Sequence, residues 1–369
     1  MNVDKRNLEE ARGDKMQPGR LSQAIWKKNI VHPLERAGVC APLFGTTQGS
    51  VTQNFAQNFS KERVSDVAQV CLFGKSPATV TYGIYRGMNE LAVSDVCAAG
   101  LDLHAELPEE TTEDWIRQMT EELIETLQEQ HLWIRTLTVR INPAVKLPIF
   151  TLNVLGTEKA PGTEKDWKRS DSAQGIPDLS GIKKQIEAGV DYDILMLSGA
   201  GTEGILRILE EREEELSKRF VPAFLRQTKA LKQGLCATTQ IEKIRQEDPK
   251  AILYQIGEGG VFAALWDLLE PLELGMEIRM DQILICQETV EISEFYRVNP
   301  YLMTSTGSFL ILSACGDRLL FALEEMGARA SKLGIATNVP ARVILGQSEK
   351  RYLDRPLPDE LMVWQNRSR

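Results

Sequence analysis

Two glycine-rich turns, each between an apolar run and a helical pattern, constrain the fold of this chain more than any other feature. The first contains Gly199, Gly201 and Gly204 in the spacing G-x-G-x-x-G, directly after the apolar run ILMLS. The second is the run Gly257–Gly260, which follows AILYQI and precedes the amphipathic pattern VFAALWDLL. Strand, turn and helix in this order are typical of sheets covered by helices, so the sequence predicts an α/β fold.

The G-x-G-x-x-G spacing by itself suggests a dinucleotide-binding enzyme, but its context argues against one. A dinucleotide-binding unit needs a second strand about 20 residues after the glycines, ending in an acid that binds the ribose hydroxyls. Here the glycines are followed by a helical pattern over residues 204–233, with no strand in the required place. The sequence therefore does not predict a nicotinamide or flavin site.

Both turns leave two interpretations open. Glycine reaches positive φ, and a turn that leads into a helix points backbone N–H groups at whatever lies there. Such N–H groups bind anions, so we expect the two turns to face one cleft that accepts a small phosphate-bearing ligand. The alternative is a tight structural connection that requires small residues. Neither turn is a Walker loop, because no G-K-[ST] follows the glycines.

Charge and composition narrow the class of protein. The chain has 369 residues, enough for two domains, and a formal net charge of −9. An acidic chain lacks the basic surface that nucleic acids and anionic membranes attract, so neither is an expected partner. The apolar runs are short and the first residues contain no apolar signal segment, which favours a cytoplasmic location.

Changes in composition along the chain predict two domains. We expect a polar tail over residues 1–20 and an N-terminal domain over residues 21–158. A polar, turn-rich linker is expected over residues 159–190, and a C-terminal domain over residues 191–369.

The N-terminal half contains several recognisable elements. Apolar residues at helical spacing predict a helix within residues 108–130, and apolar alternation predicts strands at residues 133–141 and 149–155. The β-branched runs Thr79–Ile84 and Val93–Val96 are also expected to form strands.

The C-terminal half resembles the aminoimidazole ribonucleotide (AIR) synthase superfamily. The resemblance rests on EGGVFAALWDLLE, ILICQETVEISEFYRVNPYLMTSTGSFLI and RYLDRPLPDEL. Within the superfamily it is similar to AIR synthase-related proteins of the hydrogenase maturation factor HypE type. Thiamine-monophosphate kinase and selenophosphate synthetase are more distant. The resemblance implies an N-terminal domain that dimerises through its sheet, a C-terminal domain over a cleft, and ATP held with magnesium on acidic residues.

Transferred residue by residue, the resemblance assigns a small set of site residues. The family's Asn-Asp pair looks like Ser94-Asp95 here, so Asp95 is the implied magnesium ligand. Glu258, Gly259 and Gly260 match the last three residues of a family motif, His-Asp-x-Thr-Glu-Gly-Gly. The first glycine turn takes the place of the family's Gly-rich turn. The implied cofactor-binding residues are Asp95, Gly199, Gly201, Gly204, Glu258, Gly259 and Gly260.

Other family motifs are missing. Residues 40–59, where the family carries a Gly-Asp-Asp or Gly-Glu-Asp, contain no acid, and the chain ends in VWQNRSR without the cysteine of the maturation factor. Magnesium-bound ATP needs several carboxylates, so the sequence favours a degenerate member with a depleted Mg-ATP site. Such a protein would act as a binding or scaffold partner, in a homodimer or in a heterodimer with an active paralogue. The alternative is an active ATP-dependent enzyme of amide or carbamoyl activation or phosphoryl transfer.

Overall fold

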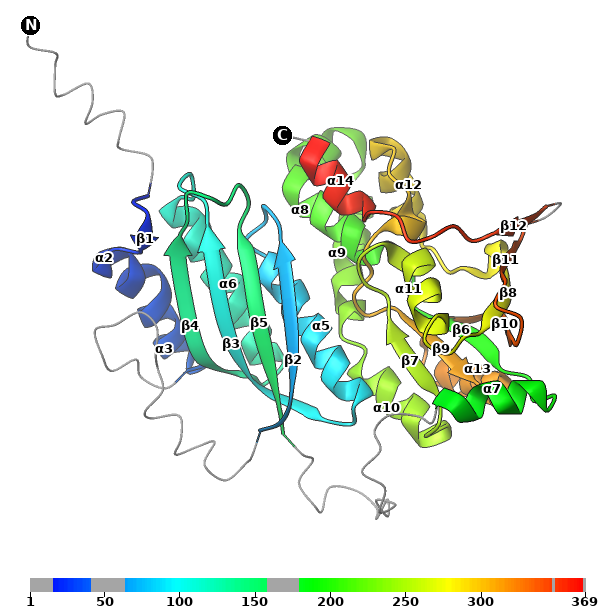
Figure 1. Ribbon diagram of the computed structural model, residues 1–369. Helices are drawn as coiled ribbons and strands as arrows, with labels where there is room; N and C mark the ends of the chain where they lie inside the picture. The colour runs from blue at the N-terminus through cyan, green and yellow to red at the C-terminus, as the bar shows by residue number, and fades with distance from the viewer. Residues whose placement is uncertain (1–15, 41–63, 158–178, 347–348, 368–369) are drawn as a thin grey trace, which may run out of the picture. The chain divides into compact units, whose positions relative to one another are not determined.

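The computed structural model describes residues 16–40, 64–157, 179–346 and 349–367 (Figure 1). The chain forms two compact units. The N-terminal unit comprises residues up to Pro161 apart from Ala92–Asp95, and the C-terminal unit comprises Ala92–Asp95 and everything from Gly162 onward. Each unit contains one mixed sheet with helices packed on it, so the predicted α/β class is confirmed.

The N-terminal unit has a five-stranded sheet in the order β1-β4-β3-β5-β2, in which β3 and β4 are parallel and the other neighbours antiparallel. Its strands are β1 (Gly19–Arg20), β2 (Val64–Phe73), β3 (Cys97–Leu107), β4 (Trp133–Ile141) and β5 (Ile149–Thr157). Its helices are α2 (Gln23–Trp26), the π-helix η1 (Lys27–Val31), α3 (His32–Ala37), α5 (Thr79–Val93) and α6 (Glu113–Glu129). The predicted strands at 133–141 and 149–155 and the predicted helix are confirmed.

One face of this sheet is apolar and lies under α5. Two helical glycines, Gly83 and Gly87, allow the close approach. A Cβ at Gly83 would lie 2.6 Å from a Leu72 methyl, and a Cβ at Gly87 would lie 2.4 Å from a Val154 methyl. Larger residues there would push the helix off the sheet.

The opposite face of the same sheet is polar. The cross-strand register places Cys71, Thr151, His104 and Thr138 in one row, since each pairs with the next on the neighbouring strand. None of these four side chains is buried. The described part of the unit therefore has one apolar face and one open, hydrogen-bonding face.

The two predicted strands at Thr79–Ile84 and Val93–Val96 are wrong. Residues Thr79–Val93 form helix α5, and the chain then turns into β3. Every residue from Thr79 to Tyr85 is buried, so the run has no solvent-exposed side and shows no amphipathic helical period in the sequence. Thr81 satisfies its hydroxyl within the helix by donating to the Ala78 carbonyl at 2.8 Å.

The C-terminal unit has a seven-stranded sheet in the order β12-β11-β8-β10-β6-β9-β7. Its strands are β6 (Asp193–Leu197), β7 (Ile252–Gln255), β8 (Gly275–Arg279), β9 (Phe309–Ser313), β10 (Ala330–Thr337), β11 (Arg342–Leu345) and β12 (Lys350–Tyr352). Its α-helices are α7 (Leu179–Glu187), α8 (Thr202–Arg219), α9 (Pro222–Ala230), α10 (Thr238–Glu247), α11 (Gly260–Leu269), α12 (Gln287–Tyr296), α13 (Gly316–Glu325) and α14 (Glu360–Arg367). Three short 3₁₀ turns complete the described part: η2 (Leu231–Leu235), η3 (Met280–Gln282) and η4 (Pro300–Leu302).

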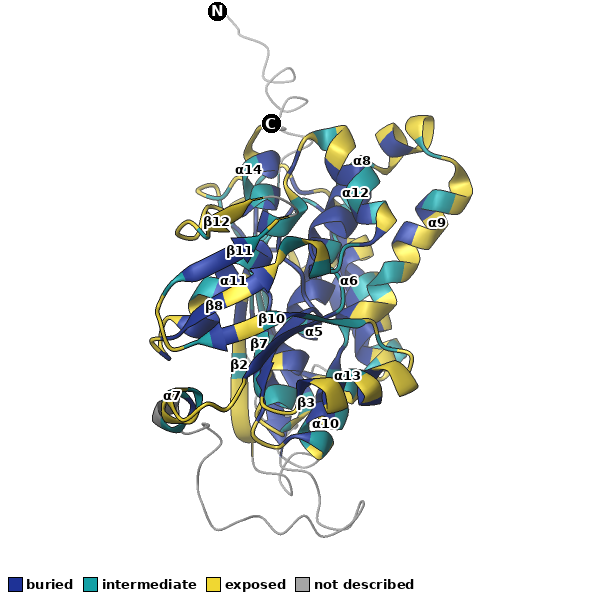
Figure 2. Ribbon diagram, turned by 90° about the vertical axis from the view of Figure 1, so that its right-hand side faces the viewer, coloured by how far each residue is buried: buried dark blue, intermediate teal, exposed yellow. Residues whose placement is uncertain are grey.

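Both faces of this second sheet are covered at its central strand β6. Along β6, Ile194 and Met196 point into a core shared with α11, whereas Leu195 and Leu197 point into a core shared with α10 and α13. A third apolar cluster joins α8, α9, α12 and α14. Figure 2 shows buried colour on β11, both buried and exposed colour on β8, and exposed colour on the edge strand β12. Strand β6 lies between two antiparallel neighbours, which differs from the parallel dinucleotide-binding sheet.

The expected tail and linker differ from the structure in detail. Gly19–Arg20 was expected in the tail but pairs with β4 as strand β1. Helix α7 (Leu179–Glu187) lies inside the expected linker 159–190, because Ile182 and Ile186 give it an apolar side that packs on the C-terminal core. Residues 1–15 and 158–178 lie outside the described part. Within the part that the structure describes, no helix is long and apolar enough to cross a membrane.

Candidate functional site

The first glycine turn leads from β6 into α8 and packs tightly against one other segment. Gly201 is the N-cap of α8 and has a φ of 72°, a conformation that glycine adopts at no steric cost. A Cβ at Gly201 would lie 3.0 Å from the Pro300 carbonyl oxygen, and one at Gly204 would lie 2.9 Å from the sulfur of Met303. These two glycines are therefore needed for contact with the segment 300–308.

The second glycine turn packs against the same segment. Gly259 is the N-cap of α11 with a φ of 78°, and Gly260 follows with a φ of 68°. A Cβ at Gly260 would lie 2.3 Å from the Tyr301 carbonyl oxygen. Both predicted turns therefore contact the same segment, residues 300–308.

Four glycines of the two turns use their backbone N–H groups within the chain: Gly201, Gly204, Gly259 and Gly260. Gly204 donates to the Thr304 carbonyl at 3.1 Å, and Gly260 donates to the Gly257 carbonyl at 3.1 Å. Gly201 donates to the Ser305 hydroxyl at 2.6 Å. A tight structural connection therefore accounts for Gly201 and Gly204 in the first turn.

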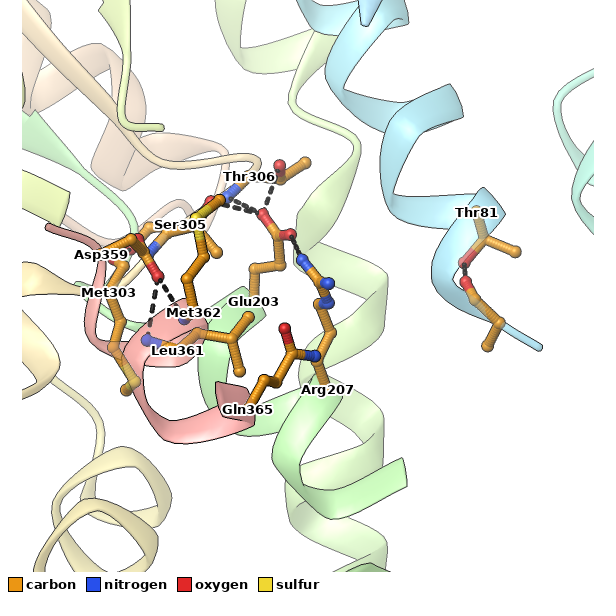
Figure 3. Close-up of polar contacts among 12 residues, drawn as sticks. Thr81, Glu203, Arg207, Met303, Ser305, Thr306, Asp359, Leu361, Met362 and Gln365 are labelled. Carbon is orange, nitrogen blue, oxygen red and sulfur yellow. Dashed lines mark hydrogen bonds and ion pairs between the residues drawn. The ribbon is translucent and has the colours of Figure 1, made fainter. Parts of the chain in front are cut away.

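At the second turn the acceptor is a carboxylate. The Gly259 N–H donates to Oδ2 of Asp359 at 2.9 Å, and the Thr304 N–H donates to the same oxygen at 2.8 Å. The other oxygen, Oδ1, accepts the N–H groups of Leu361 at 2.9 Å and Met362 at 3.4 Å in the first turn of α14 (Figure 3). An anion does lie against this turn, and it belongs to the protein.

Sequence reasoning missed Asp359, although a local signal was present. Asp359 precedes the apolar positions of α14, and aspartate is a preferred N-cap residue. Its second role, as acceptor for a turn 100 residues away, has no local signal.

Burial perturbs this carboxyl group. Asp359 is 4% exposed, and its removal from water raises its pKa from 3.8 to about 6. The hydrogen bond from Gly259 lowers the pKa and the nearby negative charge of Glu203 raises it, both to a smaller extent than burial. The backbone donors only partly offset the cost of burying the charge.

A buried ion pair lies beside Asp359. Glu203 and Arg207 are one helical turn apart in α8, 3% and 4% exposed, with Oε1 and Nη1 separated by 3.0 Å. The other oxygen of Glu203 accepts the hydroxyls of Thr304 and Thr306, each at 2.8 Å (Figure 3). Because its N–H binds Asp359 and its hydroxyl binds Glu203, Thr304 links the two carboxylates.

The remaining predicted site residues lie outside this buried network. Asp95 follows α5 and has a φ of 59°, and Glu258 is exposed. Among the described residues, no group of three or more His, Cys, Asp or Glu side chains is arranged to hold a metal ion. The acid-free stretch at 40–59 lies outside the described part apart from Cys40.

At the second turn, the N–H group of Gly259 is already bound within the chain. A phosphate placed on the Gly259 N–H would meet the Asp359 carboxylate, which already holds that donor at 2.9 Å. The donor at Gly259 is therefore occupied by the protein itself.

Comparison with known proteins identifies the fold. No protein-family model matches this chain, and no curated protein matches its sequence. E. coli HypE, a hydrogenase maturation protein, is 16% identical with a TM-score of 0.63, covering 89% of this chain and 98% of its own. A HypE structure in complex with ATP is 13% identical with a TM-score of 0.64, covering 93% and 97%.

A thiamine-monophosphate kinase from Stenotrophomonas maltophilia K279a is 14% identical with a TM-score of 0.51, covering 77% of this chain and 85% of its own. The chain therefore has the two-domain fold of the HypE and thiamine-monophosphate kinase structures, as the resemblance predicted. At these identities the likeness concerns the fold, and function depends on the residues present at the site.

Proposed function

We propose that this protein is a HypE-like member of the AIR synthase superfamily that acts as a non-catalytic binding or scaffold partner. The contact between Gly259 and Asp359 at 2.9 Å carries the proposal, because an internal carboxylate holds a donor that a phosphate would need. The single acid Asp95 at the implied magnesium position also supports it, since a hard cation bound with ATP requires several oxygen ligands.

The proposed scaffold role includes a dimer formed through the open face of the N-terminal sheet. The row Cys71, Thr151, His104 and Thr138 offers donors and acceptors to a partner, and Val67 beside it on β2 is 46% exposed. Polar groups surrounding apolar contacts are common in protein–protein interfaces. The partner is a second copy or an active paralogue. A cytoplasmic location is part of the proposal and can be checked by cell fractionation.

Calorimetric titration with ATP, with and without magnesium, tests the non-catalytic role. Several lost charge-assisted contacts of about 1.5–3 kcal/mol each should weaken binding by several powers of ten, so we expect no magnesium-dependent heat. Tight magnesium-dependent binding of ATP would contradict the proposed non-catalytic role.

The second candidate is an active ATP-dependent enzyme. It draws on the HypE structure that was solved in complex with ATP, and residues 41–63, outside the described part, would have to contribute the missing ligands. ATP hydrolysis that Asp95→Asn abolishes would favour this candidate over the first.

A further inference from the structure

A hollow with an excess of positive charge lies on the first helical segment of the N-terminal unit, which runs through α2, η1 and α3 (Figure 1). Its volume is about 620 Å³. The chain as a whole carries a net charge of −9, so this hollow is a local exception to its acidic balance. The lining consists of Ala24, Lys27, Lys28, His32, Glu35 and Arg36.

The π-helical turn explains why these cations gather on one side of the segment. In η1 the His32 N–H donates to the carbonyl of Lys27, five residues earlier. Five residues of an α-helix make about 1.4 turns and would separate the two side chains, whereas a π-turn returns residue i+5 to the same side. Lys28 lies four residues before His32 and Arg36 four residues after it, so they share this side as well. Turns of this kind are rare and occur frequently at functional sites.

Two of the cations are not neutralised within the part of the chain that the structure describes. Lys27 is exposed and makes no side-chain hydrogen bond or ion pair with a described residue. Arg36 is also exposed, and its Nε donates to the His32 carbonyl at 3.2 Å rather than to a carboxylate. Lys28 lies 3.4 Å from Glu113, an exposed pair that water and salt weaken. The hollow therefore keeps a positive excess that attracts an anionic group.

We propose that this hollow binds an extended acidic segment of a partner protein. Lys28, His32 and Arg36 recur every four residues, and side chains at this helical spacing start about 5–6 Å apart. Alternate residues of an extended chain lie about 6.6–6.8 Å apart and point to the same side. A segment with Asp or Glu at alternate positions therefore matches the row of cations. The inference goes beyond the proposed function, since a catalytically active protein of this fold can carry the same surface.

A peptide fits this surface better than a nucleic acid does. The row from Lys28 to Arg36 spans about 12 Å at 1.5 Å per residue, which is the length of about five extended residues. Glu35 and Glu113 lie among the cations and would repel a continuous phosphate backbone. A peptide can place its carboxylates only where the cations lie, so the charge complementarity favours an acidic peptide segment.

Fluorescence anisotropy of a labelled short peptide, in which glutamate and serine alternate, tests the proposal with the full-length protein at low salt. We expect saturable binding that weakens with added sodium chloride, and no binding of the peptide in which glutamine replaces glutamate. Lys27→Glu combined with Arg36→Glu should weaken binding about tenfold or more, because two attractive contacts become repulsive. The control combines Arg226→Glu and Lys350→Glu, two exposed cations of the C-terminal unit. It changes the net charge equally and should alter binding less than about twofold.

A wild type that does not bind the peptide, or an equal loss in both variants, overturns the proposal, because the charge of the hollow would then have no specific effect. Tighter binding of a single-stranded oligothymidylate, abolished by the same two reversals, would also overturn it and identify a nucleic-acid surface. If the reversals disturb folding, Lys27→Gln combined with Arg36→Gln supplies the test and should give a smaller loss. Magnesium-dependent ATP binding by a wild type that also binds the peptide would contradict only the proposed function.

Discussion

The carboxylate of Asp359 accepts the backbone N–H of Gly259 at 2.9 Å, joining the end of the chain to a turn 100 residues earlier. The same oxygen accepts the Thr304 N–H, so three separate segments meet at one buried charge. A glycine turn that looks like a ligand site in the sequence is therefore part of the internal packing of the C-terminal unit.

The pH dependence of stability should report the Asp359 carboxyl group. Its pKa is raised from 3.8 to about 6 on folding, so the folded protein binds the proton more tightly than the unfolded chain. The stabilising contribution is then complete below about pH 4 and is lost as pH rises through about 6, a change on the order of 3 kcal/mol. Urea denaturation of wild type and Asp359→Asn between pH 4 and 7 checks this. A difference between the two proteins that stays constant with pH would contradict it.

The buried pair in α8 should matter far more than an exposed pair in the same helix. Glu203→Gln removes a buried charge beside Arg207 and should cost about 2–4 kcal/mol in the free energy of unfolding. The control is Glu214→Gln, whose partner Lys218 is also exposed, with an expected change of less than about 0.5 kcal/mol. Equal effects of the two changes on urea midpoints would show that the buried network is not important for stability.

Two glycines in the C-terminal unit should respond oppositely to alanine. Gly260→Ala places a Cβ 2.3 Å from the Tyr301 carbonyl oxygen at a φ of 68°, so we expect a loss of about 3 kcal/mol or more. At Gly234 a Cβ meets nothing within 4 Å, and alanine there should be neutral or stabilise by up to about 1 kcal/mol. Thermal unfolding of both variants makes the comparison, and a stable Gly260→Ala protein would disprove the described packing.

The Asp95→Asn change should alter neither the stability of the protein nor its magnesium-dependent binding of ATP. Asparagine tolerates the left-handed conformation that Asp95 adopts at a φ of 59°, so stability should change by less than about 1 kcal/mol. In the proposed non-catalytic protein, the variant should also show the same absence of magnesium-dependent ATP heat as the wild type. Magnesium-dependent ATP binding that disappears in the variant would instead identify Asp95 as a ligand.

Sedimentation should show a dimer at micromolar concentration. Thr151→Glu places a charge at the centre of the open row on the N-terminal sheet, next to Cys71 and His104, and should shift the protein to monomer. Ala223→Glu, on the exposed first turn of α9, should leave the dimer intact. A wild-type monomer, or a Thr151→Glu variant that still dimerises, would argue against this interface.

The spacing of apolar residues in the sequence was sufficient to predict the helices and strands that bury only one side. Helix α6 shows apolar residues at helical spacing because one face packs and the other meets water, and strands β4 and β5 alternate for the same reason. The pattern failed for α5, whose β-branched first turns are buried on every side. Such a run has no polar face, so its period is not visible in the sequence and tertiary packing decides its conformation.

By itself, the sequence determined that the residues around Gly201 and Gly259 form tight turns before helices, because glycine adopts left-handed conformations at no steric cost. It could not determine what the turns bind. A hydrogen-bond donor pairs with whichever acceptor the fold brings within about 3 Å, and Asp359 is brought there by the docking of α14 through Leu361 and Trp364. Whether a glycine turn is open to a ligand or filled by the chain was therefore decided by long-range packing of the C-terminal segment.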